Sequence, residues 1–166
     1  SDAIITTNSK DVQKASENGI TAAFIDRLTL NAERIESMAA GLESIASLDD
    51  PIGRELARWQ QPNGLDIARI ATPLGIIGII YESRPNVTVD AAALCLISGN
   101  AAILRGGSDS YFTSGILARL MVEGLESANL PAANVQMRPS VPLSRRSFRQ
   151  SKLRWSLLAV CGPIRR

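Results

Sequence analysis

The spacing of hydrophobic residues along the chain divides it into a helical part and a mixed part. Up to about residue 48, apolar residues recur every three or four positions, as on one face of an amphipathic helix. This pattern predicts a helix over the first 16 residues and a short helix after Thr21. It also predicts a longer helix that Asn31 caps and that ends before Asp49.

A segment rich in turn-forming residues follows, and residues 51–64 are therefore predicted to form a connector. Residues 65–70 then alternate between apolar and polar side chains, which is typical of a half-exposed strand. Such a strand suits the edge of a sheet or an interface with another chain. We expect it to be an oligomerisation strand.

The next apolar segment, residues 73–81, is rich in β-branched residues and is interrupted by two glycines. It predicts a strand buried in a parallel sheet, with a functional loop at its carboxyl end. A helix capped by Thr88 is expected next, then a strand at 101–105, a helix capped by Ser108 and a strand at 134–137. The chain is thus predicted to have an α/β fold, with amino-terminal helices packed on a partial Rossmann-type parallel sheet.

The composition is that of one globular domain, with 166 residues of which 45% are hydrophobic. No segment approaches the ~20 apolar residues of a membrane-spanning helix, and the pattern of a signal peptide is absent, so the cytoplasm is the expected location. The chain has no histidine, and its two cysteines lack the spacing of metal ligands. Zinc chemistry and catalysis by histidine are therefore excluded within this chain.

Charge divides the chain at one point. Residues 1–137 hold ten basic and sixteen acidic side chains, a net charge of −6, whereas residues 138–166 hold eight basic side chains and no acidic one. We expect the first part to be a partial cofactor-binding domain and the second to be a basic tail. A nucleic-acid-binding arm is the functional alternative for the tail, but no binding fold accompanies it and we do not expect nucleic acid as a partner.

Three segments, at 62–65, 73–88 and 90–108, together resemble the glutamate-5-semialdehyde dehydrogenase family of the aldehyde dehydrogenase superfamily. The most specific motif is the hexapeptide YESRPN at 81–86, and the resemblance extends from about Ile4 to Met137. It implies NADPH-dependent reduction of L-glutamate 5-phosphate to L-glutamate 5-semialdehyde and phosphate, the second step of L-proline biosynthesis. In this family a cysteine thiolate forms a thioacyl intermediate that accepts a hydride, and the full-length enzyme is expected to be a homo-oligomer.

The resemblance also implies a cofactor site after the strand at 101–105. Arg105 stands where the superfamily usually has a ribose-binding lysine, and its planar guanidinium suits the 2′-phosphate of NADPH. Gly106 and Gly107 allow the backbone to approach a ligand closely, and Ser108 or Asp109 follows where the superfamily often has an acid that contacts the ribose hydroxyls. The alternative is that these residues form only a turn between a strand and a helix.

Residues near the end of the preceding strand are the candidates for contact with the substrate. The resemblance makes Asn86 a candidate donor to the oxyanion, with a gapless alignment placing Arg84 nearer that position and a turn residue beside Pro85 as the alternative. Ser83 and Arg84 are candidate contacts to substrate or cofactor. Cys95 lies within an apolar helical segment, so we interpret it as a core residue with an unactivated thiol.

After Met137 the resemblance ends, before the glycine-rich cofactor loop and the nucleophilic cysteine of the family. The abrupt change of composition looks like a shift of reading frame, and a disordered basic segment is the alternative. We do not expect Cys161 in this tail to replace the nucleophile. The chain as written is therefore expected to be inactive, and the alternative function is a noncatalytic fragment that associates with the full-length enzyme through residues 65–70.

Overall fold

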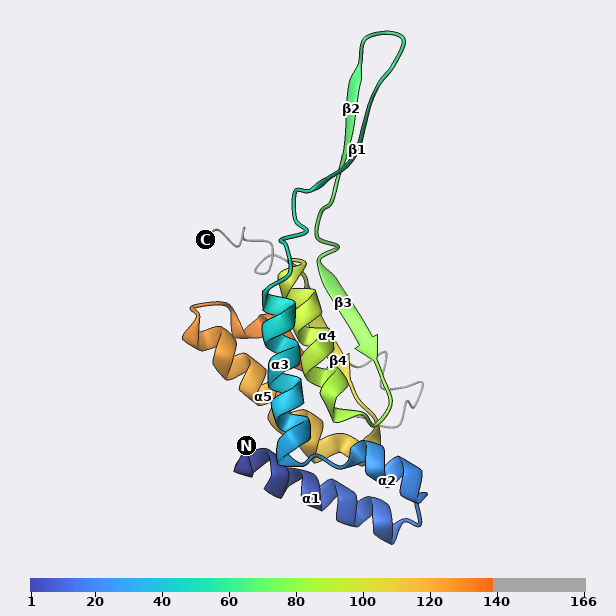
Figure 1. Cartoon of the computed structure of the whole chain (residues 1–166), viewed down its shortest axis with the longest axis vertical. Helices are drawn as coiled ribbons and strands as arrows, with labels where there is room; N and C mark the ends of the chain where they lie inside the picture. Colours follow the sequence, from blue (N-terminus) through green and yellow to red (C-terminus); the bar gives the residue numbers. More distant parts are fainter. Residues whose placement is uncertain (139–166) are drawn as a thin grey trace, which may run out of the picture.

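The computed structural model describes residues 1–138 (Figure 1). The predictions for the basic tail and for Cys161 therefore lie outside the described residues, apart from Arg138. The helices are α1 (Asp2–Glu17), α2 (Ala22–Leu28), α3 (Ala32–Ala46), α4 (Pro85–Ile97) and α5 (Tyr111–Ser127), with 3-10 turns η1 (Ser108–Ser110) and η2 (Ala132–Asn134). The strands are β1 (Glu55–Gln60), β2 (Asp66–Ile70), β3 (Ile76–Ile80), β4 (Ala101–Arg105) and β5 (Val135–Met137).

The main sheet is parallel and has the strand order β3-β4-β5. Leu104 at its centre pairs with Ile79 on one side and Met137 on the other, so the three strands end at the same edge. Helix α4 connects β3 to β4, and α5 connects β4 to β5. The predicted α/β fold class is confirmed. The prediction that the strand within 73–81 is buried was wrong, because β3 lies at the edge of the described sheet and Ile80 is 77% exposed.

The core lies around the middle strand and the helices that pack on it. Ala102 and Leu104 of β4 are completely buried, as is Ala92 of α4. A second cluster joins α1, α3, α4 and α5, and its buried members are Ile4, Leu30, Met38, Val89 and Leu117. The amino-terminal helices are thus part of the same body as the sheet, which agrees with the sequence prediction.

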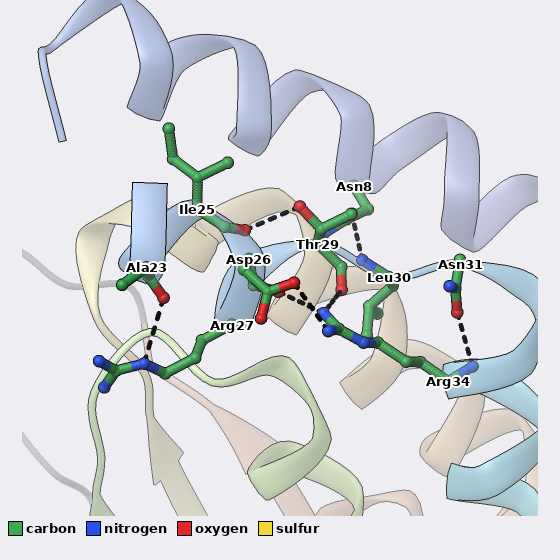
Figure 2. Close-up of polar contacts among 9 residues, drawn as sticks. All are labelled: Asn8, Ala23, Ile25, Asp26, Arg27, Thr29, Leu30, Asn31 and Arg34. Atoms are coloured by element: carbon green, nitrogen blue, oxygen red, sulfur yellow. Dashed lines mark hydrogen bonds and ion pairs between the residues drawn. The ribbon is translucent and has the colours of Figure 1, made fainter. Parts of the chain in front are cut away.

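The amino-terminal helices are fixed by polar side chains as well as by apolar contacts. Asn31 caps α3 as predicted, because its side-chain oxygen accepts a hydrogen bond of 2.8 Å from the Arg34 amide. Asn8 in α1 is buried, and its amide donates to the Leu28 carbonyl. Its oxygen accepts from the Leu30 amide at 2.7 Å (Figure 2). Asn8 therefore holds α1 against the segment between α2 and α3.

Strands β1 and β2 form an antiparallel hairpin that extends away from the rest of the described chain (Figure 1). The strand at 65–70 was predicted, but the assignment of residues 51–64 to a connector was wrong because β1 lies within them. Each side chain of β1 is at least partly exposed, so pairing with β2, rather than burial of a face, holds this strand in place. A strand of this kind leaves little hydrophobic signal in the sequence.

Helix α4 begins earlier than predicted. Thr88 was expected to cap it, but the helix starts at Pro85, with Arg84 in the capping position. Proline fits the first turn because the missing N–H has no partner there in any helix. The Thr88 hydroxyl instead forms a hydrogen bond of 2.7 Å with the Tyr81 hydroxyl. Similarly, Ser108 begins the turn η1 rather than α5.

Candidate functional site

A cavity of about 250 Å³ opens at the carboxyl ends of β4 and β5, and we call it the sheet-end cavity. Its lining comes from the β4–α5 loop, the first turns of α5 and the end of β5: Gly106, Gly107, Tyr111, Phe112, Gly115, Met137 and Arg138. Arg105 is the last residue of β4 and directly precedes this lining, and Ser108 directly follows Gly107. Of the predicted cofactor residues, Gly106 and Gly107 therefore line one cavity, with Arg105 and Ser108 next to them in the chain.

The two glycines of this loop lie against the β3–α4 loop. A Cβ atom on Gly107 would lie 3.1 Å from the Ser83 nitrogen and would overlap the Ser83 hydroxyl. A Cβ atom on Gly106 would lie 3.2 Å from both the Ser114 hydroxyl and the Tyr81 ring. Both spacings are tighter than ordinary van der Waals contact, so the absence of a side chain allows the two loops to meet.

Polar contacts also join these loops. The buried Ser83 hydroxyl donates to the Asp109 carboxylate at 3.4 Å, and the Tyr81 amide donates to the Arg105 carbonyl at 3.1 Å. Ser83 thus bridges the functional loop after β3 and the loop of the sheet-end cavity. The sequence pointed to both loops but not to their contact.

The Tyr81 ring lies next to Gly106 in the β4–α5 loop. Burial raises the pKa of Tyr81, with opposing effects from hydrogen bonds to Thr88 and Ser114. The phenol is therefore neutral at pH 7, and either hydroxyl can be the donor in its bond with Thr88. We assign it a structural role in joining β3 to α4.

A second cavity, of about 530 Å³, lies between α2, α3 and the start of α4, and we call it the arginine cavity. Its lining residues are Asp26, Arg27, Leu30, Arg34, Ser37, Met38, Gly41, Arg84, Asn86 and Asp90. The predicted residues Arg84 and Asn86 are therefore in a different cavity from Gly106 and Gly107. The Asn86 amide donates to the Asp90 carboxylate at 3.3 Å, and its role as an oxyanion donor stays a prediction.

The arginines of this cavity differ in what they contact. Arg34 forms an ion pair of 2.9 Å with Asp26 and also donates to the Thr29 carbonyl at 2.8 Å. Arg27 donates from Nε to the Ala23 carbonyl at 3.2 Å, and its guanidinium points away from the Asp26–Arg34 pair (Figure 2). Sequence reasoning missed Arg27, because nothing in its helix distinguishes it from a surface arginine.

Cys95 is 5% exposed and belongs to the core cluster around β4. Burial raises the pKa of its thiol, which disfavours the reactive thiolate. The interpretation of Cys95 as a core residue is confirmed. Within residues 1–138, no group of three metal-ligating side chains converges, and none of the helices has the length and apolar character to cross a membrane.

Several known proteins similar to this chain share one name. No protein-family model matches the chain. It is 55% identical over 136 residues to Gamma-glutamyl phosphate reductase of Brucella suis, a match that covers 82% of this chain and 32% of the relative. The same-named protein of Paramagnetospirillum magneticum is 57% identical over 137 residues, again with 82% of this chain and 32% of the relative covered.

Two similar solved structures have the same name. The crystal structure of Gamma-glutamyl phosphate reductase from Thermotoga maritima matches with a TM-score of 0.76 and 42% identity, and covers 81% of this chain and 33% of that one. The structure from Saccharomyces cerevisiae matches with a TM-score of 0.75 and 31% identity, and covers 82% and 36%. The curated homologues and the structural neighbours of this chain are thus gamma-glutamyl phosphate reductases, of which it spans about a third of the length.

Proposed function

We propose that residues 1–137 are a partial cofactor-binding domain of a gamma-glutamyl phosphate reductase. In this proposal the enzyme uses NADPH to reduce L-glutamate 5-phosphate to L-glutamate 5-semialdehyde and phosphate in L-proline biosynthesis. The sheet-end cavity is the observation that supports it most, because ligands of parallel α/β sheets bind beyond the carboxyl ends of the strands.

The residues around this cavity fit a dinucleotide. The rings of Tyr111 and Phe112 are half exposed at its wall, with centroids 5.3 Å apart, and offer apolar faces to an adenine ring. Gly106 and Gly107 line the cavity and let its loop pack against the β3–α4 loop, and Arg105 beside them is suited to a 2′-phosphate. Bound NADPH supplies the hydride, and the chain's own residues hold the adenosine end.

In this proposal the described residues bind the cofactor but do not carry out the reduction. Reduction of an acyl phosphate through a thioester needs an accessible thiolate, whereas Cys95 is buried and the pKa of its thiol is raised. We therefore expect the 166-residue chain to bind NADP without turnover of glutamate semialdehyde. Cofactor binding is the appropriate measurement.

Substitution of Arg105 tests the cofactor assignment. We expect Arg105→Gln to weaken NADP binding about tenfold, since a charge-assisted contact to the 2′-phosphate is lost. Binding of NAD, which lacks this phosphate, is expected to change less than about twofold. Both affinities can be measured by calorimetric titration of the purified chain.

Arg119→Gln is the matched control, because Arg119 lies on the exposed side of α5 and pairs with Glu123 at 3.3 Å. It removes the same charge without reaching the sheet-end cavity, so both affinities should stay unchanged. Equal loss of NADP and NAD binding in Arg105→Gln would count against recognition of the 2′-phosphate. Absence of NADP binding to the unsubstituted chain would remove the cofactor proposal itself.

The hairpin supports a second, noncatalytic function: association with a full-length enzyme. Leu56, Trp59, Leu65 and Ile70 on or next to β1 and β2 are each exposed by more than 40%. A two-stranded sheet is only marginally stable alone, and apolar residues on both strands suit a protein partner. We propose that the partner is a full-length copy of the reductase.

Replacing Trp59 by lysine is expected to weaken this association about tenfold or more, because exposed tryptophans often dominate interfaces. Light scattering of the chain with and without full-length reductase measures the effect. Gln61→Lys, just beyond β1, adds the same charge without removing an apolar side chain and should leave association unchanged. Unaltered complexes with Trp59→Lys would mean that another surface makes the contact.

A further inference from the structure

The arginine cavity is lined by cationic and anionic side chains at separate positions. A ligand that fits this arrangement carries both a negatively and a positively charged group. We propose that the cavity binds the α-amino-acid end of the substrate, with Arg27 and Arg84 on the α-carboxylate and Asp90 on the α-ammonium group. The inference rests on the proposed reductase function and deepens it, since it assigns one end of an acidic amino-acid substrate to this cavity. The phosphate end then lies elsewhere.

Two of the three arginines have donors left for a ligand. Arg34 is committed to Asp26 and to the Thr29 carbonyl, so it joins α2 to α3. Among residues 1–138, Arg27 donates only from Nε, and the Arg84 guanidinium forms no hydrogen bond or ion pair. A carboxylate between two such guanidinium groups accepts charge-assisted hydrogen bonds from both.

Asp90 supplies the opposite charge. It lies one helical turn after Asn86, whose amide donates to it at 3.3 Å, and no described arginine or lysine pairs with it. Asp26, the other carboxylate of the lining, is already neutralised by Arg34. A free carboxylate attracts an ammonium group and repels a phosphate dianion, which is why the cavity suits the amino-acid end.

Gly41 leaves space for a ligand in the arginine cavity because it has no side chain. It lies inside α3, where glycine is unfavourable relative to alanine, and a Cβ atom there would lie 3.9 Å from the Asp90 carboxylate. A longer side chain at this position would extend toward Asp90 and occupy the cavity. The volume of about 530 Å³ is within the usual range for small-molecule sites.

The test is an NMR titration of the full 166-residue chain with three probes: L-glutamate, glutarate and inorganic phosphate. We expect L-glutamate to bind more tightly than either of the others. Arg27→Gln and Arg84→Gln should each weaken L-glutamate binding about tenfold. Asp90→Asn should remove the preference for L-glutamate over glutarate, which lacks the ammonium group. Arg69→Gln on the exposed hairpin is the charge control and should have no effect.

A variant that fills the cavity without changing its charges gives an independent test. Gly41→Leu should abolish L-glutamate binding with every charge retained, whereas Gly124→Leu, at an open helical position in α5, should not. If Gly41→Leu fails to fold, the charge variants decide. Absence of L-glutamate binding, competition by phosphate at equal affinity, or unchanged binding in the arginine variants would overturn the inference. NADP titration of the same variants tests the sheet-end cavity separately, so either proposal can fail alone.

Discussion

Replacing Asp11 by alanine is expected to lower the free energy of unfolding by about 3 kcal/mol. Asp11 lies in α1 and is 1% exposed, and its carboxylate accepts from the Thr113 amide at 2.7 Å and hydroxyl at 2.6 Å, and from the Phe112 amide at 3.2 Å. Alanine would leave these donors without an acceptor in the interior. Urea unfolding followed by circular dichroism measures the change.

Two further variants test whether the loss of stability comes from the hydrogen bonds of Asp11. Asp11→Asn retains one acceptor oxygen and should lose about 1 kcal/mol. Asp2→Ala removes an exposed carboxylate from the first turn of the same helix and should change stability by less than about 0.5 kcal/mol. A loss below that size in Asp11→Ala would mean that water reaches the donors and that the network contributes little.

Replacing Gly107 by valine is expected to have the second large effect: a loss of about 3 kcal/mol in stability together with loss of NADP binding. Gly107 has φ −65° and ψ 161°, which any residue adopts, so the constraint is space and not backbone conformation. The added side chain would collide with Ser83 and separate the two loops beside the sheet-end cavity. Thermal unfolding and NADP titration measure the two effects.

Gly115→Ala is the matched control for this experiment. Gly115 lines the same cavity within α5 and has nothing within 4 Å of an added Cβ, so alanine should be neutral or stabilising by about 0.5–1 kcal/mol. Combining Gly107→Ala with Ser83→Ala should cost less than the sum of the two single changes, because the colliding hydroxyl is gone. Strict additivity would contradict a collision with that hydroxyl.

Much of the fold was predictable because burial of one face makes apolar residues recur at a regular spacing in the sequence. The apolar face of α3 has such a period, β3 and β4 are short apolar segments, and Asn31 is a cap whose partner lies three residues away. The burial of β3 was predicted wrongly, because an apolar segment does not show whether a strand lies inside a sheet or at its edge. Strand β1 was missed because it has no buried face and exists through its pairing with β2. The start of α4 was misplaced because Thr88 has the residue type of a helix cap. In the structure its hydroxyl instead forms a hydrogen bond with the hydroxyl of Tyr81, the residue that follows β3.

The candidate site was predictable only where its residues are neighbours in the chain. Arg105, Gly106 and Gly107 form one segment, which the family resemblance made a candidate for ligand binding, whereas the pattern alone left a simple turn equally open. The contact of Gly107 with Ser83 joins two loops, and the contact of Arg27 with the arginine cavity depends on how α2 packs. Neither leaves a local pattern, since both are set by tertiary packing.

The position of Asp11 has a consequence for how a dinucleotide can be held. The amino end of a helix carries a partial positive charge and free amides, and it commonly binds the diphosphate of a nucleotide. In α5 two of these amides, on Phe112 and Thr113, already donate to a carboxylate from α1. An incoming diphosphate would therefore meet an internal anion there. In the cofactor-binding mode proposed above, the adenosine would be held by the β4–α5 loop and the diphosphate by an element other than the amino end of α5.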